Sequence, residues 1–176
     1  LPTRKPCMAE GTEPESLPTL PVHQGGAPNS ASPRLVVDGL VARRLELTPA
    51  DLAAFPPAEV TDDFRCLEGW SVPGLHWMGI SLATVLEAAG VAAQARFVQA
   101  SSGEFSVPLP IEQARGALLA TRLGDAPLPG EHGWPVRLVV PGADCFTSIK
   151  WLDRIELRAQ PDMNTGKEIA LGRLAR

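Results

Sequence analysis

The segment Phe64–Ser71 contains the residues best suited to chemistry, a cysteine at position 66 and a glutamate two residues later. A cysteine thiolate is a strong nucleophile and a soft metal ligand, so Cys66 could be the centre of a catalytic or metal site. Free cysteine is also among the most buried residue types, and on that ground alone an inert thiol would be the better interpretation. The other cysteines, Cys7 and Cys145, form no C-x-x-C pair with it. This spacing excludes a zinc ribbon and a thioredoxin motif but leaves a Cys66–Cys145 disulfide open.

The elements that must position this segment are predominantly short strands. The 18 prolines and 16 glycines among 176 residues indicate frequent turns. Thr48 followed by Pro49 has the pattern of a helix start, and the apolar residues of 82–89 recur at helical spacing before Gly90. We expect strands over residues 34–41, 95–100, 105–109, 136–140 and 148–157, and a short helix at 111–115.

The composition indicates one globular domain preceded by an arm. Residues 1–33 are rich in Pro, Gly and Ser without periodicity, so we expect a flexible N-terminal arm. Residues 34–176 predict a single α+β domain, in which β-rich mixed sheets are accompanied by few short helices. The net charge of -4 argues against nucleic-acid binding. No apolar run approaches the ~20 residues that a membrane span requires.

Five segments, in this order, resemble the molybdopterin-binding core of the sulfite oxidase family, which includes the bacterial methionine-sulfoxide reductases. They are LVVDGLV (35–41), RCLEGWS (65–71), WMGISL (77–82), HGWPVRLVVP (132–141) and SIKWL (148–152). Each segment alone is a weak signal, but five in register are specific, and they cover most of residues 35–157. The resemblance implies a sulfite-oxidase-type molybdopterin-binding fold with molybdopterin and molybdenum as cofactors.

The resemblance also implies roles for individual residues. In the family, the cysteine of the R-C-x-E-x-W-S block ligates molybdenum, a role that falls on Cys66. Glu68 would face the metal as a catalytic proton carrier or solvent anchor. A planar guanidinium and a turn of amides and hydroxyls suit the pterin phosphate, although the same charges could also be solvated strand ends. The implied cofactor-binding residues are Cys66, Ser101, His132, Arg137, Ser148, Ile149 and Lys150.

The implied function is that of a mononuclear molybdenum oxidoreductase that catalyses oxygen-atom transfer. Departures from the sulfite-oxidising branch favour a small S-oxide or N-oxide over sulfite. Gly69-Trp70 stands where that branch carries an Asn-Arg pair, Thr147 replaces a usual basic residue, and the chain contains no tyrosine. Cys145 replaces a usual glycine, and we expect it to be inert packing. Sulfite oxidation is the alternative activity.

Two further alternatives are a catalytically silent molybdopterin-binding module and a metal-free interaction domain in which Cys66 is merely buried. As an enzyme, the chain would exchange electrons with a separate haem or other electron-transfer protein, because it carries no haem-binding motif. The resemblance to this family favours a periplasmic or otherwise exported protein over a cytoplasmic one. No leader is visible in the sequence.

Overall fold

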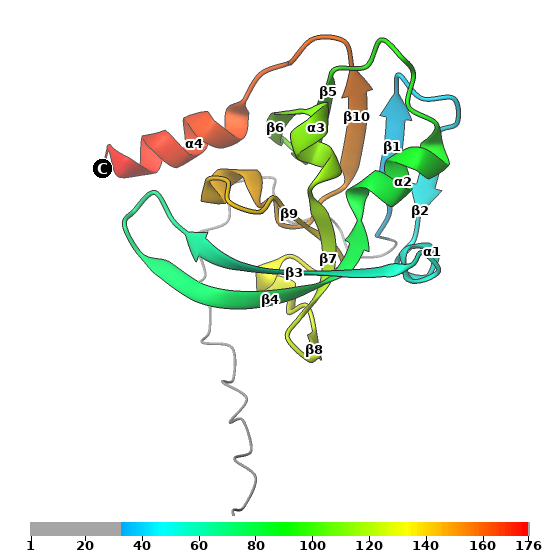
Figure 1. Ribbon diagram of the computed structural model, residues 1–176. Coiled ribbons are helices and arrows are strands. Elements are labelled where there is room, and N and C mark those ends of the chain that lie inside the picture. The colour runs from blue at the N-terminus through cyan, green and yellow to red at the C-terminus, as the bar shows by residue number, and fades with distance from the viewer. Residues whose placement is uncertain (1–32, 176) are drawn as a thin grey trace, which may run out of the picture.

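Strands make up most of the regular structure in this computed structural model, which describes residues 33–175 (Figure 1). The predicted arm therefore lies outside the described residues except for its last position. One sheet has the strand order β2-β1-β10-β5-β6, and β1 and β10 are parallel while its other neighbours are antiparallel. The bounds are β1 Leu35–Gly39, β2 Leu45–Leu47, β5 Phe97–Ser102, β6 Phe105–Pro110 and β10 Arg154–Arg158.

The second sheet is antiparallel and carries the cysteine segment. Its order is β3-β4-β7-β8, with β9 also paired to β7. Figure 1 shows β3 and β4 as a long, curved hairpin that runs across the lower part of the view, with β8 below it. The bounds are β3 Pro57–Arg65, β4 Ser71–Ser81, β7 Leu118–Leu123, β8 Ala126–Pro127 and β9 Arg137–Val139.

The helices are short, and their ends follow the predicted signals. Thr48 and Asp51 form a reciprocal capping box at the start of α1, and Gly90 closes α2 with a left-handed φ of 71°. None of the described helices is long and apolar enough to cross a membrane. The bounds are α1 Pro49–Ala53, α2 Leu82–Ala89, α3 Ile111–Arg115, α4 Thr165–Leu174, and the 3-10 turns η1 Gly130–His132 and η2 Cys145–Thr147. The predicted β-rich α+β class is confirmed.

Two apolar clusters hold the sheets together. The larger one joins the first sheet to α2 and to inward residues of the second sheet, such as Ile80, Leu119 and Leu138. A smaller cluster around Trp77 and Val139 lies on the second sheet. Because side chains alternate across a strand, β9 contributes Leu138 to the larger cluster and Val139 to the smaller one. This alternation also places Arg137 on the side of Trp77.

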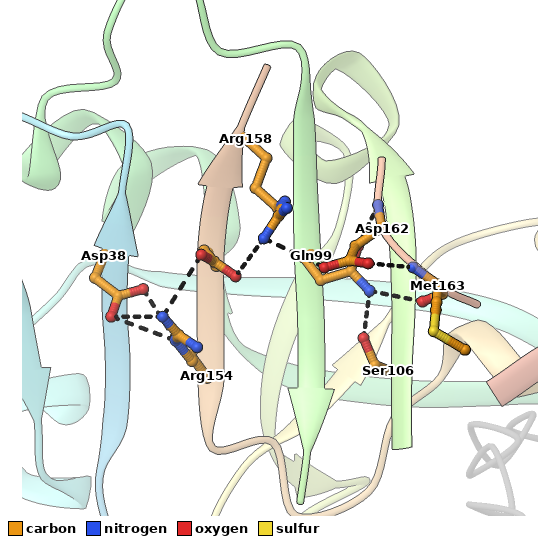
Figure 2. A network of polar contacts seen from close by, with 8 residues as sticks. Asp38, Gln99, Ser106, Arg154, Arg158, Asp162 and Met163 are labelled. Atoms are coloured by element: carbon orange, nitrogen blue, oxygen red, sulfur yellow. Dashed lines mark hydrogen bonds and ion pairs between the residues drawn. The ribbon is translucent and has the colours of Figure 1, made fainter. Parts of the chain in front are cut away.

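A polar network covers the face of the first sheet opposite the main core (Figure 2). Arg154 of β10 binds Asp38 of β1 at 3.1 Å, while Gln99 of β5 donates to the carbonyl of Met163 at 2.9 Å. Exposed ion pairs of this kind contribute roughly 0–1 kcal/mol each to stability. The amide of Gln99 nevertheless fixes the connection that leads from β10 to α4.

The C-terminal part of the chain differs from the prediction. The strand expected over residues 148–157 begins only at Arg154, because Trp151 has a positive φ of 52° and interrupts the extended backbone. Helix α4 was not predicted, since Gly166 and Gly172 weaken its helical signal. Gly166 packs so tightly that a Cβ there would lie 2.7 Å from a Val107 methyl. Packing against β6 therefore stabilises a helix that its own sequence does not favour.

Candidate functional site

Cys66 lies in the turn that joins β3 to β4. Its amide donates to the carbonyl of Trp70 at 2.9 Å, and its carbonyl accepts from the amide of Gly69 at 3.0 Å. Gly69 has a φ of 92°, which a residue with a Cβ rarely adopts. These bonds hold the backbone of Cys66 in one conformation, as a site residue requires.

The thiol of Cys66 has an acidic and an aromatic neighbour. Its Sγ lies 3.8 Å from Oε2 of Glu68, and that oxygen accepts a hydrogen bond from the Trp70 indole at 3.2 Å. Burial raises the pKa of Cys66 to about 11, and the charges of Cys145 and Glu68 add to this effect. The ligand-free site therefore holds a thiol, and a metal ion would have to displace its proton.

Cys145, at the start of η2, brings a second thiol to the site. Its Sγ lies 3.9 Å from Sγ of Cys66. The carbonyl of Cys145 accepts from the amide of Ser148 at 3.1 Å, and the preceding loop is tied to β3 by a 2.7 Å bond from the amide of Gly142 to Asp62. Sequence reasoning left a bridge open but preferred inert packing for Cys145. The available signal was a thiol at a position where the family usually has glycine.

Arg137 is buried with only 2% of its surface exposed. Its guanidinium carbon lies 5.3 Å from the ring centre of Phe64 and 5.2 Å from that of Trp77. Nη1 donates to the carbonyl of His132 at 3.1 Å, whereas Nε has no hydrogen-bond partner. Burial lowers the pKa of Arg137 to about 10, yet the group stays charged at neutral pH. A buried cation with an unused donor fits an anionic ligand.

His132 is buried at the end of η1, and its Nδ1 also has no hydrogen-bond partner. Burial lowers the pKa of His132, and the positive charges of Lys150 and Arg137 lower it further. The imidazole is therefore neutral at neutral pH, with a ring nitrogen available to a polar ligand.

Lys150 lies against the same turn. Its Nζ donates to the carbonyl of Glu131 at 2.8 Å and sits 5.6 Å from the ring centre of Trp151. Burial, followed by repulsion from Arg137, lowers the pKa of Lys150 to about 8. Gly133 allows the two backbones to approach closely, because a Cβ at position 133 would lie 3.0 Å from Cα of Lys150. Gly133 also has a φ of 114°, which a residue with a Cβ rarely adopts.

The remaining predicted residues lie along or beside one segment, residues 145–153. The carbonyl of Ile149 accepts from the amide of Leu138, one residue after Arg137, at 2.9 Å. The amide of Asp153 donates to the carbonyl of Ser101 at 3.0 Å. The structure thus gathers the predicted cofactor-binding residues around residues 145–153. Cys66 contacts this segment through its Sγ, which lies next to Sγ of Cys145. Their individual roles stay predictions.

A hollow of about 270 Å³, including its open part, is lined in part by Cys145 and by Arg65, the residue before Cys66. Asp63 forms an ion pair with Arg65 at 3.3 Å, which leaves the carboxylate of Asp62 as the uncompensated charge of the lining. The lining residues are Asp62, Asp63, Phe64, Arg65, Trp77, Val139, Val140, Ala143, Cys145 and Ser148.

Residues 24–165 match the family model of the oxidoreductase molybdopterin binding domain. The chain belongs to this family. Three relatives agree with the assignment. The uncharacterized oxidoreductase YuiH of Bacillus subtilis is 36% identical over 69% of this chain and 63% of its own length. The methionine-sulfoxide reductase catalytic subunit MsrP of Campylobacter jejuni is 27% identical over 81% and 54%, and the sulfite oxidase of Arabidopsis thaliana is 27% identical over 72% and 42%.

The fold of this oxidoreductase molybdopterin binding domain is also that of a solved relative. The sulfane dehydrogenase SoxCD of Paracoccus pantotrophus superposes with a TM-score of 0.69 at 24% identity, over 81% of this chain and 41% of the other. The predicted sulfite-oxidase-type fold is confirmed. The chain spans less than two thirds of the length of these relatives.

The residues of the site fit a molybdopterin cofactor. Arg137 Nε and His132 Nδ1 are buried without partners, and Lys150 adds a second cation, so an anionic pterin group would satisfy groups that the protein leaves unpaired. Cys66 offers the soft sulfur ligand that molybdenum requires. Within residues 33–175 no group of three or more His, Cys, Asp or Glu side chains could hold a metal ion. The metal would therefore need the ligands that the pterin brings.

Proposed function

We propose that this chain is the catalytic core of a mononuclear molybdenum oxidoreductase that reduces a small, neutral S-oxide or N-oxide. The observation that carries the substrate class is the lining of the hollow beside Cys145, whose Sγ lies 3.9 Å from that of Cys66. Its carboxylates, Asp62 and Asp63, outnumber its single cation, Arg65, and Glu68 places a further negative charge 3.8 Å from Sγ of Cys66. The buried Arg137 and the half-buried Lys150 are not among the lining residues.

This charge distribution disfavours a small dianion such as sulfite. Moving an anion out of water is costly unless fixed cations replace its hydration, and two like charges near 4 Å repel by about 1 kcal/mol even in water. A neutral oxide carries no such penalty. The apolar part of the lining, Phe64, Val139, Val140 and Ala143, suits its organic substituents.

The cofactor, when bound, supplies the two-electron redox change and the oxygen-atom transfer. The protein chain would hold the cofactor in position and deliver protons to the reacting region. Cys66 would hold the metal, while Arg137, His132 and Lys150 would hold the pterin. Glu68 is exposed and lies 3.8 Å from the thiol of Cys66, so its carboxylate can carry a proton from solvent toward the reacting region. The Trp70 indole keeps this carboxylate oriented.

The electrons would come from a separate redox protein, a haem protein or another carrier. MsrP is, by its name, a catalytic subunit. The match to MsrP covers 81% of the chain described here and 54% of MsrP. We extend the proposal to an exported location.

The test compares kcat/KM for methionine sulfoxide, trimethylamine N-oxide and sulfite on one metal-loaded preparation. An artificial electron donor drives the two reductions, and ferricyanide accepts electrons from sulfite. We expect at least one oxide to be reduced and sulfite oxidation to be slow. Efficient sulfite oxidation with neither oxide reduced would contradict the substrate class but keep the cofactor. Bound molybdenum without turnover of any of the three would instead indicate a silent cofactor-binding module.

A further inference from the structure

Phe64 and Trp70 form an aromatic pair at the closed end of the β3–β4 hairpin. Their ring centres lie 5.6 Å apart, and their planes are inclined by 27°. The strand register explains this contact, because Phe64 lies opposite Val72 and Trp70 precedes Val72 by two residues. Side chains two positions apart share a face of the strand, and a diagonal pair of this kind is within reach of aromatic rings. Both rings pack against the smaller apolar cluster.

A bulge in the hairpin sets this register. The pairing shifts by one residue between Asp62 and Phe64, so that β4 carries one residue more than β3 at this point. The amide of Gly74, which has a φ of 63°, donates to the side chain of Asp63 at 3.0 Å and holds the bulge. A one-residue shift turns the side chains beyond it to the other face, so the bulge is what places Phe64 on the side of Trp70.

The Phe64 ring also contacts a residue that is firmly held. The guanidinium carbon of Arg137 lies 5.3 Å from the centre of this ring. Arg137 is buried at the start of β9, where it pairs with Ala120 of β7. Cation–π and aromatic contacts both have preferred geometries, so the ring links the interior of the second sheet to the indole on the turn.

The Trp70 indole in turn binds Glu68. Its Nε1 donates to Oε2 of Glu68 at 3.2 Å, and the same oxygen lies 3.8 Å from Sγ of Cys66. Glu68 is exposed, and a long exposed side chain loses rotamer freedom when it is held in one place. The hydrogen bonds of the turn join backbone atoms of Cys66, Gly69 and Trp70, so they do not set the side-chain torsions of the tryptophan. A ring packed against the indole can set them.

We propose that Phe64 is a positioning residue for Glu68: its ring holds the Trp70 indole where Nε1 binds the carboxylate beside Cys66. The inference rests on the proposed function, in which Glu68 carries a proton toward the reacting region. Phe64 itself transfers no proton. Its ring narrows the range of positions from which Glu68 acts, so that loss of the ring slows turnover through the carboxylate.

Fluorine NMR of the full chain labelled with 5-fluorotryptophan tests this role without requiring turnover. The chain has four tryptophans, and Trp70→Phe identifies the resonance of Trp70. We expect Glu68→Gln to shift this resonance, because the indole N–H loses a charged acceptor. In Phe64→Leu the resonance itself should move, and its response to Glu68→Gln should be lost. Phe64→Tyr keeps a ring and should retain the response.

Phe97→Leu is the matched control, since it makes the same change at a half-buried position of β5, in the first sheet. Its Trp70 resonance should respond to Glu68→Gln as in the wild type. An equal response with and without the Phe64 ring would overturn the inference. Phe64→Met, whose flexible side chain adapts to irregular gaps, replaces Phe64→Leu if the latter does not fold.

Kinetics of the metal-loaded protein separate this inference from the proposed function. Phe64→Leu should lower kcat for S-oxide reduction about tenfold or more, as part of the roughly 10²–10⁴-fold that general acid–base catalysis contributes. In a Glu68→Gln background the same substitution should have no further effect, because two residues that act as a unit are not additive. A loss of equal size in both backgrounds would overturn the inference. Wild type that binds no molybdenum or reduces no oxide contradicts the proposed function, and the fluorine measurement still decides whether Phe64 holds the Trp70–Glu68 pair.

Discussion

Arg137 donates from Nη1 to the carbonyl oxygen of His132 at 3.1 Å, while its Nε has no hydrogen-bond partner. The bond fixes one end of the guanidinium and leaves the other end available. His132 has an unpartnered Nδ1 of its own. Two neighbouring buried residues thus offer polar atoms that the protein itself does not satisfy, which is costly unless a ligand completes them.

We expect Arg137→Met to have opposite effects on cofactor binding and on cofactor-free stability. Pterin retention should fall about 10- to 100-fold, because a charge-assisted hydrogen bond contributes roughly 1.5–3 kcal/mol. The cofactor-free protein should be as stable as the wild type or more stable, because an apolar side chain replaces a buried charge. Fluorescence of released pterin and urea unfolding measure the two effects. Arg115→Ala, which removes only an exposed pair with Glu112, is the control. Unchanged pterin retention would contradict the prediction.

Lys150 should make the stability of the cofactor-free protein depend on pH. Its pKa is about 8 in the folded protein and ordinarily 10.5, so between these values the folded state binds fewer protons than the unfolded state. The contribution of Lys150 to the free energy of unfolding therefore rises with pH across this window. Any stability advantage of Lys150→Met over the wild type should accordingly shrink from pH 8 to pH 10.5.

Denaturant unfolding at several pH values measures this difference. Cys66 and Arg137 also titrate in alkaline solution, but both are present in wild type and variant, so their effects cancel in the comparison. Lys167→Met, which removes the same charge at an exposed position on α4, is the control. A parallel pH dependence for wild type and Lys150→Met would show that the ammonium group is not desolvated.

Asp62→Asn should make the hollow more tolerant of anions. The amide oxygen can still accept from Gly142, so the loop stays attached, but one negative charge is lost. We expect sulfite to inhibit S-oxide reduction several-fold more strongly, as about 1 kcal/mol of lost repulsion predicts, and the effect should weaken with added salt. Inhibition constants measure it. Asp125→Asn makes the same charge change in the β7–β8 turn, outside the hollow, and equal effects of the two variants would rule out a local cause.

Cys66→Ser should keep the fold and lose the thiolate character of the metal site. A hydroxyl is a harder and weaker ligand than a thiolate, so the visible absorption of the metal should change. Turnover should fall by at least about 100-fold, the upper end of the cost of losing even an outer partner. Circular dichroism confirms the fold, and absorption with kcat measures the effect. An unchanged spectrum with unchanged activity would remove Cys66 from the metal site.

The sequence predicted features that depend on neighbours along the chain. The capping box of Thr48, the apolar face of α2 and its closure at Gly90 all follow from residues within a few positions of one another. The five motif segments also indicated the family, which the match over residues 24–165 confirms. These features required no knowledge of tertiary packing.

Features that depend on distant segments could not be predicted in this way. The approach of Cys145 to Cys66 joins positions 79 residues apart. The complete burial of Arg137 was also unexpected, because a lone charge at the start of a strand is ordinarily solvated. Helix α4 forms because Gly166 fits closely against β6, a contact that no local pattern reveals.

Strand β10 occupies the middle of the first sheet, between β1 and β5, although it is the last strand of the described chain. Before it inserts, β1–β2 and β5–β6 are two separate hairpins with unpaired edges. The segment 145–153 leads directly into β10, so the central sheet stays incomplete until the predicted cofactor-binding residues 148–150 have been synthesised. Long-range pairing of this kind is slow. We therefore expect cofactor loading to follow synthesis of the domain rather than accompany it, so that a growing chain exposes its cysteines before a metal can bind them.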